Sequence, residues 1–379
     1  MAIPFVDLKL QHEHLLPDLM KEYERIFHDG NFILGEEVEK FENALAEWLG
    51  VEIAVGVNSG TDALIMGLRG LGIGPGDEVI LPVYTFVATA DAVVRAGAKP
   101  VFVDIDPRTY NLDPEKIHEA VTEKTKAVIV VHLYGQAADV DAVCAIARER
   151  NLRVIEDAAQ ALGTRRRGKP VGTFGDVGCF SFYPTKNLGA AGDAGALVST
   201  DEDVIMTAIQ MRDHGRSVTV PEMVFEMIGY NSRLSVLQAA FLGLKLADLD
   251  ELLVDRIENA RFYDQQFANT ELALPEFHDD LSHTYNLYTV QVRDRDRLRN
   301  YLREKKIGSG VYYSKPLHLQ PCFADLGYSD HTFPVAEAVC EKVISLPIYP
   351  GLKKHEMETV AGTVLEFLEN NEPITANRR

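Results

Sequence analysis

Two charged side chains have the types and the surroundings that amine chemistry needs. Lys186 lies in the run FSFYPTKNLG, which covers residues 180–189, and Asp157 follows the apolar run Leu152–Ile155. A lysine amine on a short glycine-rich loop can form a Schiff base with an aldehyde. An acid at the end of a strand can keep a ring nitrogen protonated, so that the ring accepts electrons. An isolated Asp and Lys would more often be a helix cap and a solvated loop residue, so the neighbouring residues must decide.

A hydroxyl- and glycine-rich segment suggests a phosphate site. Asn58-Ser59-Gly60-Thr61 follows a predicted strand, Ile53–Val57, and opens a predicted helix, Asp62–Leu71. Free amides at a helix start attract phosphate, although the segment taken alone reads more simply as an ordinary N-cap. Its place after a parallel strand favours the phosphate interpretation. Ser181 offers a further hydroxyl shortly before Lys186, with a structural strand serine as the alternative. The sequence contains neither GxGxxG nor GxxxxGK[ST], so dinucleotide and P-loop interpretations lack support.

Short apolar runs alternate with helical patterns through the first two thirds of the chain. Most of these runs are apolar at consecutive positions, as expected of strands buried on both faces. Predicted strands are Ile53–Val57, Glu78–Leu81, Pro100–Val103, Ala127–Val131, Arg153–Ile155, Val177–Phe182 and Ala196–Ser199. Predicted helices are 11–28, 36–48, Asp62–Leu71, Thr85–Ala96, Pro114–Val121 and Asp139–Arg150. The pattern predicts an α/β fold with a largely parallel sheet.

The pattern changes after about residue 230. A long helical stretch over 235–268, with a bend near Asp248, leads into a different arrangement. Its predicted elements are a strand at Thr284–Val292, a helix at Arg295–Lys305, a strand at Gly310–Tyr313 and helices at Val335–Val343 and His355–Leu368. We therefore predict a large α/β domain over residues 1–245 and a smaller C-terminal α+β domain over residues 246–379.

Composition excludes several classes of partner. With 38 Lys+Arg against 57 Asp+Glu, the formal net charge of the 379-residue chain is −19, which argues against binding to nucleic acid or to an anionic membrane. No apolar run is long enough to span a bilayer, and the first residues do not form a secretory signal. The four cysteines are scattered without CxxC spacing or clustered histidines, so we expect free thiols, no metal site and a cytoplasmic location.

The chain resembles the sugar-nucleotide aminotransferases of the DegT/StrS type, which belong to the fold-type-I pyridoxal phosphate (PLP) enzymes. The resemblance covers nearly the whole chain, and as a set its motifs are highly specific. They are Phe5-Val6-Asp7-Leu8, Gly35-Glu36-Glu37-Val38, Asn58-Ser59-Gly60-Thr61, Pro82-Val83-Tyr84-Thr85-Phe86, Val103-Asp104-Ile105-Asp106, Glu156-Asp157-Ala158-Ala159-Gln160, Phe180-Ser181-Phe182, Gly229-Tyr230-Asn231-Ser232-Arg233-Leu234 and Gln238-Ala239-Ala240. The resemblance implies a mostly parallel, seven-stranded sheet flanked by helices, with a smaller C-terminal α+β domain.

The resemblance also implies a set of contacts to the cofactor ring. Lys186 would carry PLP covalently and act as the catalytic base and acid. Asp157 would pair with the pyridinium nitrogen, and Gln160 would contact the ring oxygen. Phe86 and Ala158 would lie on the two faces of the ring. An amino acid, expected to be L-glutamate, would donate its amino group to the cofactor. This donation would convert PLP into its pyridoxamine phosphate form.

The implied phosphate site involves two subunits. Gly60, Thr61 and Ser181 of one subunit would hold the phosphate, joined by Asn231 from the other subunit. We therefore expect a homodimer with active sites at the interface, which agrees with a two-fold contact being the commonest form of oligomer.

The implied reaction is amination of a nucleotide-linked keto sugar. Lys186 stands where dehydratase relatives carry histidine, and the Gly229–Leu234 segment resembles the branch that aminates C-3 of dTDP-3-keto-6-deoxyhexoses. Alternatives of the same family are a C-4 aminotransferase or one that acts on a cyclitol or an aminobenzoate precursor. The alternative of another class is a PLP-binding regulator without turnover, which an intact pair of Asp157 and Lys186 disfavours.

Several aromatic and basic residues are candidates for contacts to the substrate. Tyr183, Tyr312, Tyr313 and His318 are candidate sugar contacts, although packing within the small domain explains each of them about equally well. Arg216 is the leading candidate for the diphosphate as a charge-assisted donor, with Arg233 and Lys315 behind it, and a plain surface charge is its alternative.

Overall fold

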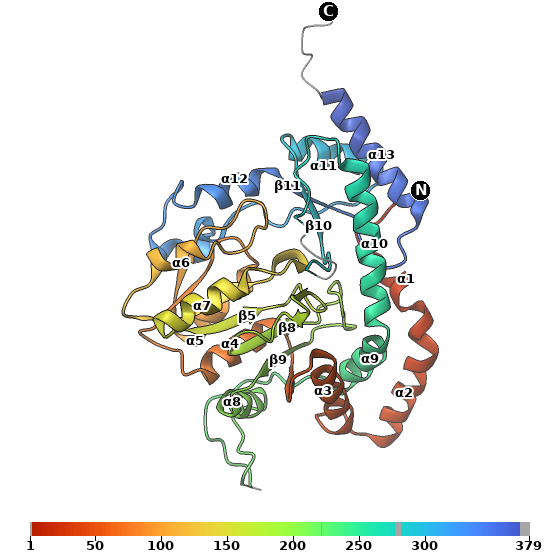
Figure 1. The fold of residues 1–379 in the computed structure, drawn as a ribbon. Coiled ribbons are helices and arrows are strands. Elements are labelled where there is room, and N and C mark those ends of the chain that lie inside the picture. The colour runs from red at the N-terminus through yellow and green to blue at the C-terminus, as the bar shows by residue number, and fades with distance from the viewer. Residues whose placement is uncertain (1, 221, 277–281, 372–379) are drawn as a thin grey trace, which may run out of the picture.

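The computed structural model describes residues 2–220, 222–276 and 282–371. Its centre is a sheet with the strand order β1-β9-β8-β5-β4-β2-β3 (Figure 1). The strands are β1 (Ala54–Val57), β2 (Glu78–Pro82), β3 (Lys99–Val103), β4 (Thr125–Val131), β5 (Arg153–Asp157), β8 (Val177–Ser181) and β9 (Gly195–Ser199). Neighbouring strands pair in parallel from β8 to β3, whereas β9 runs antiparallel to β1 and β8. The predicted mostly parallel, seven-stranded sheet is confirmed.

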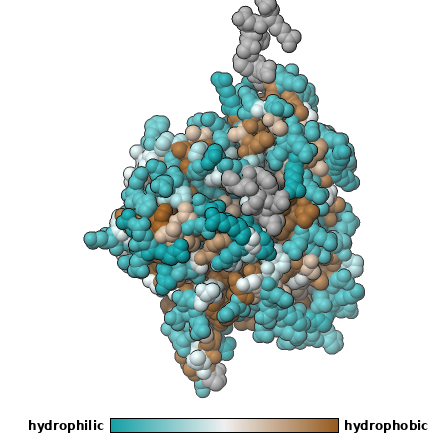
Figure 2. All heavy atoms as spheres, in the orientation of Figure 1, coloured by the Kyte–Doolittle hydropathy of each residue, from teal (hydrophilic) through white to brown (hydrophobic). Residues whose placement is uncertain are grey.

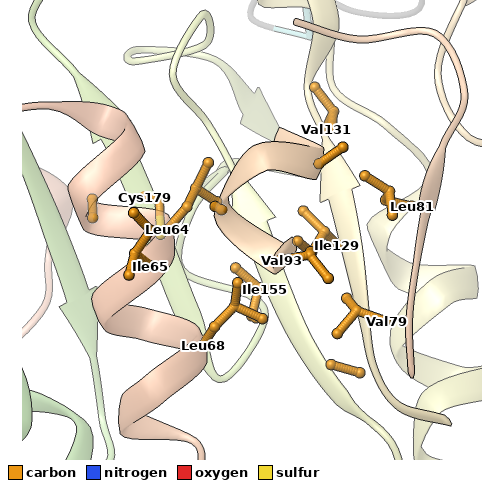
Figure 3. Packing of buried hydrophobic residues seen from close by; sticks show 14 of the residues in the cluster. Leu64, Ile65, Leu68, Val79, Leu81, Val93, Ile129, Val131, Ile155 and Cys179 are labelled. Carbon is orange, nitrogen blue, oxygen red and sulfur yellow. The ribbon is translucent and has the colours of Figure 1, made fainter. Parts of the chain in front are cut away.

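Helices bury both faces of this sheet. In β2, Val79 and Leu81 pack on one face with helices α4 (Gly60–Gly70), α5 (Val87–Ala96) and α8 (Glu202–Arg212), as Figure 3 shows for α4 and Val93 of α5. Ile80 points to the other face, which is covered by α6 (Glu115–Ala120) and α7 (Val140–Arg150). Because successive strand residues point to opposite faces, burial of both faces explains the consecutive apolar residues of the sequence.

The N-terminal helical region is more broken than predicted. In place of one helix over 11–28, the chain forms α1 (Leu8–His12), a 3-10 turn (Glu13–Leu15) and α2 (Leu16–Asp29). Pro17 stands in the first turn of α2, where a missing N–H is tolerated, but it cannot continue a preceding helix. The next helix, α3 (Glu36–Leu49), packs through Phe41 and Leu45 on the sheet and on α9 (Val236–Ala247).

The C-terminal part has its own core. Asp248 separates α9 from α10 (Leu249–Phe267), which confirms the predicted bend. Helix α10 packs with β10 (Tyr288–Gln291), α11 (Arg295–Glu304), β11 (Val343–Leu346) and α13 (Lys354–Asn371). The predicted strand at Gly310–Tyr313 is wrong, because only Gly310 forms a bridge, to Ser345 of β11. Strand β11 instead pairs with β10 and takes the end of the segment predicted as a helix over Val335–Val343.

The two predicted domains interlock. Short 3-10 turns (Leu317–Leu319 and Pro321–Leu326) and α12 (Pro334–Lys342) follow the C-terminal core in sequence. Leu317, Phe333 and Val339 nevertheless pack into the core of the large sheet, whereas Ile3 packs into the C-terminal core. The division at residues 245 and 246 stays a prediction. No helix in the described part of the chain is long and apolar enough to cross a membrane.

Several elements were not predicted. Among them are the 3-10 turn Leu133–Gly135, the hairpin of β6 (Arg165–Arg166) and β7 (Lys169–Pro170), and helix α8. Helix α8 leads into a segment that projects from the body of the molecule (Figure 1). We call residues 213–220 and 222–231 of this segment the arm.

Candidate active site

A cavity of about 540 Å³ opens at the carboxyl ends of the parallel strands. Ligands of α/β sheets bind at this edge, because the loops that follow the strands gather there. Its other wall comes from the C-terminal part, through Asn286, Leu287 and the segment that follows Gly310. The predicted site residues that line this cavity are Gly60, Thr61, Phe86, Asp157, Gln160, Ser181, Tyr183, Lys186, Tyr312 and Tyr313.

Asp157 is the last residue of β5 and is buried at the cavity wall. One carboxylate oxygen accepts a hydrogen bond from the Thr89 hydroxyl at 2.7 Å, and the other accepts one from the Ala159 N–H at 3.2 Å. Burial raises the pKa of Asp157, while these two hydrogen bonds and the charge of Lys186 act in the opposite direction. The carboxylate is therefore fixed in orientation and supported as an anion.

Lys186 lies on the loop after β8, with its N–H donating to the Tyr183 carbonyl at 2.8 Å. Burial lowers the pKa of its amine to about 8, and the charge of Asp157 opposes this shift. The next residue, Asn187, is buried and donates to the Leu162 carbonyl and to the Thr284 hydroxyl, both at 2.9 Å. The loop is thus fixed to both parts of the molecule, and its amine is partly neutral near pH 8, as a nucleophile requires.

The start of α4 and the end of β8 form an anion-binding cup. Ser59 is the N-cap of α4, and its hydroxyl oxygen accepts a hydrogen bond from the Asp62 N–H at 3.1 Å. A Cβ at Gly60 would lie 2.8 Å from the Ser181 Cβ, so only glycine lets the two elements approach this closely. The first amides of a helix lack intrahelical partners, and here they share the cavity wall with the hydroxyls of Thr61 and Ser181.

Gln160 belongs to a buried network of tyrosines. Its carbonyl oxygen accepts from the Tyr134 N–H at 2.8 Å, and its amide nitrogen donates to the Tyr313 hydroxyl at 3.2 Å. The Tyr313 N–H donates to the Tyr84 hydroxyl at 2.8 Å. Burial raises the pKa of Tyr313, so its hydroxyl stays protonated at neutral pH. The ring of Tyr313 lies 6.2 Å from that of Phe86, so the two aromatic side chains form one face of the cavity.

The contact to the cofactor ring that was predicted for Ala158 is corrected to Ala159. Ala158 is buried in the core, and its N–H donates to the Cys179 carbonyl at 2.9 Å, which continues the pairing of β5 with β8. Ala159, the next residue, lies on the cavity wall. The chain still follows the strand at Ala158, so the alternation of side chains directs Ala158 away from the cavity.

His318 is not a cavity residue, and its predicted sugar contact is wrong for this structure. It is buried beside Phe333, with ring centroids 4.8 Å apart, and its Nε2 lies 3.2 Å from the Glu337 carboxylate. Its position in a 3-10 turn explains this, because the neighbouring Leu317 packs into the core of the large sheet.

Arg216 and Asn231 lie on the arm and are exposed, outside the cavity of their own subunit. The Asn231 side-chain oxygen accepts a hydrogen bond from the Arg233 guanidinium at 2.5 Å. A role for either residue in a site requires a second subunit, so both roles stay predictions.

Sequence reasoning missed several residues that line or support the cavity. Thr89 holds Asp157, and Phe5 and Val6 reach the cavity from the N-terminus. Thr89 lies on α5, three positions after Phe86. Residues three apart lie on the same side of a helix, so Thr89 and Phe86 both lie near the edge of the sheet. The position of Phe5 depends on contacts with the C-terminal part and has no local signal.

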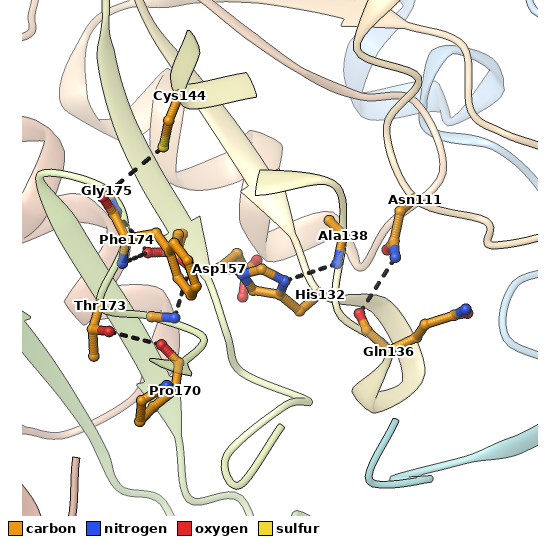
Figure 4. Close-up of polar contacts among 12 residues, drawn as sticks. Asn111, His132, Gln136, Ala138, Cys144, Asp157, Pro170, Thr173, Phe174 and Gly175 are labelled. Atoms are coloured by element: carbon orange, nitrogen blue, oxygen red, sulfur yellow. Dashed lines mark hydrogen bonds and ion pairs between the residues drawn. The ribbon is translucent and has the colours of Figure 1, made fainter. Parts of the chain in front are cut away.

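A second buried acid fixes the strand ends behind Asp157. The carboxylate of Glu156 accepts three N–H groups of the loop 172–175, at 2.6 to 2.7 Å, and lies 2.9 Å from His132 Nε2. His132 Nδ1 accepts the Ala138 N–H at 3.1 Å (Figure 4). Nε2 therefore carries the ring proton and donates to Glu156. Strands β4 and β5 and the loop before β8 are thereby held together beneath the site.

The residues of the cavity fit PLP. Gly60 lets the start of α4 approach Ser181 so that both line the cavity, an amine of lowered pKa faces the same cavity, and an acid lies at the end of β5. Together they meet the needs of a phosphate, an aldehyde and a pyridine nitrogen. Among the residues that the structure describes, no three His, Cys, Asp or Glu side chains gather in a way that could hold a metal ion. Fold and site together define a PLP-dependent aminotransferase of fold type I.

Comparisons with known proteins identify the family. The chain belongs to the DegT/DnrJ/EryC1/StrS aminotransferase family, whose model matches residues 15–365. Among solved structures, DesV of S. venezuelae in complex with a ketimine intermediate has a TM-score of 0.94 and 40% identity, over 97% of this chain and 99% of that chain. NtdA of Bacillus subtilis, with bound cofactor PMP, has a TM-score of 0.91 and 33% identity over 97% and 85% of the two chains. The cofactor is therefore PLP, with pyridoxamine phosphate as its other form.

Three relatives illustrate the names found in this family. A pleiotropic regulatory protein of Geobacillus stearothermophilus is 43% identical over 97% of this chain and 99% of its own length. A UDP-N-acetyl-3-dehydro-alpha-D-glucosamine 3-aminotransferase of Acidithiobacillus ferrooxidans is 42% identical, over 97% and 98%. A dTDP-3-amino-3,6-dideoxy-alpha-D-galactopyranose transaminase of Aneurinibacillus thermoaerophilus is 41% identical, over 96% and 99%. This chain is an aminotransferase of a family in which these relatives are named for nucleotide-linked sugars.

Proposed function

We propose that the protein transfers the amino group of L-glutamate to C-3 of a dTDP-linked 3-keto-6-deoxyhexose. The observation that carries the chemistry is the meeting of Lys186, Asp157 and the Gly60 cup in one cavity. The position on the sugar is supported by the segments Gly229–Leu234 and Tyr183–Lys186, both of which resemble the branch of the family that aminates C-3. Two similar proteins whose names specify position 3 of a nucleotide-linked sugar also support it.

Lys186 is the group that moves protons in this proposal. When bound, PLP supplies an electron sink that stabilises negative charge on the carbon next to the amine. Lys186 Nζ takes the proton from that carbon of the amino donor and returns a proton to the new amino sugar in the second half of the cycle. Its lowered pKa of about 8 suits both tasks, because it brings the amine closer to the operating pH than an ordinary lysine.

Asp157 and the cavity wall prepare the site for this proton transfer. Asp157, oriented by Thr89, would hold the proton on the ring nitrogen of the cofactor. Phe86 and Ala159 would lie against the ring, and Gln160 is held in place by its bonds to Tyr134 and Tyr313. Fixed groups of this kind avoid the cost of reorganisation during the reaction.

The proposed active unit is a homodimer. The arm carries exposed apolar side chains that a monomer would leave in water, among them Met223, Phe225 and Ile228, which is 93% exposed. Figure 2 shows brown, hydrophobic surface on the projecting lower end of the molecule. A contiguous apolar projection of this kind is typical of an interface. In the dimer, Asn231 would reach the phosphate of the partner's site, and Arg216 would meet the substrate diphosphate.

We also propose the cytoplasm as the location of this reaction. All four cysteines are free thiols, and Cys322 is exposed, a state that a reducing compartment preserves.

The regulatory alternative rests on the name of the Geobacillus relative. A regulator without turnover would have no use for a lysine that moves protons. The pair of Lys186 and Asp157 therefore favours turnover, and transfer of nitrogen from glutamate separates the two functions.

A competition assay tests the position on the sugar. Glutamate and the PLP-loaded protein are incubated with equal amounts of dTDP-3-keto-6-deoxyglucose and dTDP-4-keto-6-deoxyglucose, and the products are identified by NMR. The ketone carbon must lie about 3 Å from the attacking nitrogen, and an error of about 1 Å can cost about 10²-fold in rate. Only the 3-keto sugar is therefore expected to gain nitrogen. Amination of the 4-keto sugar alone would overturn the C-3 assignment and leave the aminotransferase function intact.

A further inference from the structure

Ile3, near the N-terminus, is held on the C-terminal part by an isolated β-bridge. Ile3 forms a parallel bridge with Ile307: its N–H donates to the Lys306 carbonyl at 3.0 Å, and its carbonyl accepts from the Gly308 N–H at 2.8 Å. The Ile3 side chain is buried in the C-terminal core. On the other side of Phe5, the Asp7 carboxylate caps α1 by accepting the Leu10 N–H at 3.0 Å. Phe5 is therefore anchored from both directions.

Glycine at two positions lets this segment approach. A Cβ at Gly308 would lie 2.4 Å from the Phe5 nitrogen and 3.0 Å from its Cα. A Cβ at Gly310 would lie 2.4 Å from the Tyr312 ring and 3.2 Å from the Phe5 ring. The absence of a side chain at Gly308 thus makes room for the Phe5 backbone, and the absence of one at Gly310 makes room for the rings of Phe5 and Tyr312.

Phe5 forms part of the cavity wall together with Tyr312. The two rings stack with centroids 6.0 Å apart and an interplanar angle of 27°. Both side chains are half-buried and line the cavity, as does the exposed side chain of Tyr183. Phe5 contacts Gly308, Gly310 and Tyr312 of the C-terminal part, and its ring keeps exposed surface at the cavity, where a ligand that extends beyond the cofactor can contact it.

We propose that Phe5 is a substrate-positioning residue that packs on the apolar face of the hexose and fixes its rotation together with Tyr312. This inference rests on the proposed function. Aromatic rings offer large apolar area at a low cost in side-chain freedom, which suits the C–H face of a pyranose. An amino-acid donor is smaller and needs only the Lys186 side of the cavity. Phe5 therefore acts on the sugar half-reaction and not on the donor half-reaction.

The test measures the two half-reactions separately in Phe5→Ala. Conversion of the PLP form by glutamate, followed by absorbance, is expected to stay within about twofold of the wild type. The KM for the keto sugar is expected to rise by about tenfold, the effect of losing one good aromatic contact. Calorimetric binding of the dTDP-linked amino-sugar product to the loaded protein should weaken by a similar factor. Phe5→Tyr should restore both quantities.

Two further variants separate positioning from stability. Gly308→Ala displaces the Phe5 backbone without changing its side chain, and it should reproduce the sugar defect. Phe262→Ala removes a partly buried aromatic residue that packs on the C-terminal core outside the cavity, and it should lower the melting temperature without changing the sugar KM. An unchanged sugar KM in Phe5→Ala, or an equal loss in both half-reactions, would overturn the inference. A wild-type protein that aminates no nucleotide sugar would overturn the proposed function, while calorimetry would still test Phe5.

Discussion

The charges of Lys186 and Asp157 interact, and burial shifts the pKa of each residue in the direction that favours its neutral form. Burial lowers the pKa of Lys186 and raises that of Asp157, while the charge of each supports the charge of the other. The pair therefore keeps an amine that can be neutral beside an acid that can remain ionised. Such opposed environments are typical of catalytic sites.

This coupling predicts how capture of the cofactor depends on pH. The neutral amine is the nucleophile, so the rate at which apoprotein binds added PLP covalently should rise with pH and level off above about pH 8. Stopped-flow absorbance across a pH series measures the midpoint. A midpoint near 10.5, the ordinary value for lysine, would show that Lys186 is not in the environment described.

Asp157→Asn should shift that midpoint to lower pH. The carboxylate raises the pKa of Lys186, so its removal leaves burial unopposed. Affinity for PLP should also fall by about tenfold or more, since a charge-assisted hydrogen bond to the ring nitrogen is lost. Thr89→Val, which leaves the charge and removes only the orienting bond, should shift the midpoint much less.

Covalent labelling distinguishes Lys186 from a second lysine of lowered pKa. Lys245 has a pKa lowered to about 8, like Lys186, but it donates to the Gly189 carbonyl at 2.8 Å away from the cavity. Borohydride should therefore fix PLP to the peptide that contains Lys186, and Lys186→Ala should abolish labelling. Lys245→Met should keep it. Label on any other lysine in the mass spectrum would contradict the assignment.

At this scale, residue types were predictable and side-chain directions were not. Lys186, Asp157, Gly60 and Ser181 follow from composition and spacing, because each stands next to a recognisable strand end. The ring contact was predicted for Ala158, one position too early, because the sequence does not show where the alternation of side-chain directions along β5 ends.

The meeting of α4 with β8 depends on a single missing side chain. A Cβ at Gly60 would lie 2.8 Å from that of Ser181, so Gly60→Ala must push the helix start away from the strand end. Affinity for PLP should fall by about tenfold or more, as the amide donors of the cup are displaced. Apoprotein titration with PLP measures this loss.

Gly362→Ala is the matched control, because a Cβ there meets nothing within 4 Å on α13. It should leave the PLP affinity unchanged and stabilise the fold by about 0.5–1 kcal/mol through helix propensity. Equal PLP affinity in the Gly60 variant and the wild type would mean that this contact does not shape the cup.

Elements were predictable where a local pattern determines them. The seven strands of the sheet were found because their burial on both faces leaves consecutive apolar residues. The segment Gly310–Tyr313 has the residue types of a strand. Among the described residues, however, it forms a bridge with Ser345 alone, and its two tyrosines line the cavity. Strand β11 was missed because its partner β10 lies more than fifty residues earlier, beyond any local signal.

For the whole molecule, the arm predicts that activity needs two chains. Lys186→Ala and Asn231→Ala should each be inactive alone, because one lacks the base and the other a phosphate contact. Mixed and reassociated, they should recover up to about a quarter of wild-type activity, since half of the dimers are hybrids and each hybrid has one intact site. Full activity of a verified monomer would contradict this account.

An arm variant tests the interface itself. Ile228→Asp places a charge on the most exposed apolar residue of the arm and should shift the protein toward monomer in analytical ultracentrifugation. Val254→Asp, at an exposed apolar position on α10 outside the arm, should leave the oligomeric state unchanged.

At the scale of the molecule, properties of composition can be predicted from the sequence, whereas contacts between residues distant in sequence cannot. The charge and the absence of a long apolar segment were readable directly, as was the change of pattern after residue 230. The position of Phe5 in the cavity and the return of Phe333 to the large core depend on long-range packing, which no spacing in the sequence displays.

The most direct test of the central claim follows nitrogen from donor to sugar. PLP-loaded protein is incubated with ¹⁵N-labelled glutamate and a panel of 3-keto and 4-keto nucleotide sugars, and the products are examined by NMR. We expect ¹⁵N bound to C-3 of the dTDP-linked 6-deoxyhexose, and no transfer by Lys186→Ala. Label that leaves glutamate but reaches no nucleotide-linked sugar, or transfer that persists without Lys186, would contradict the account.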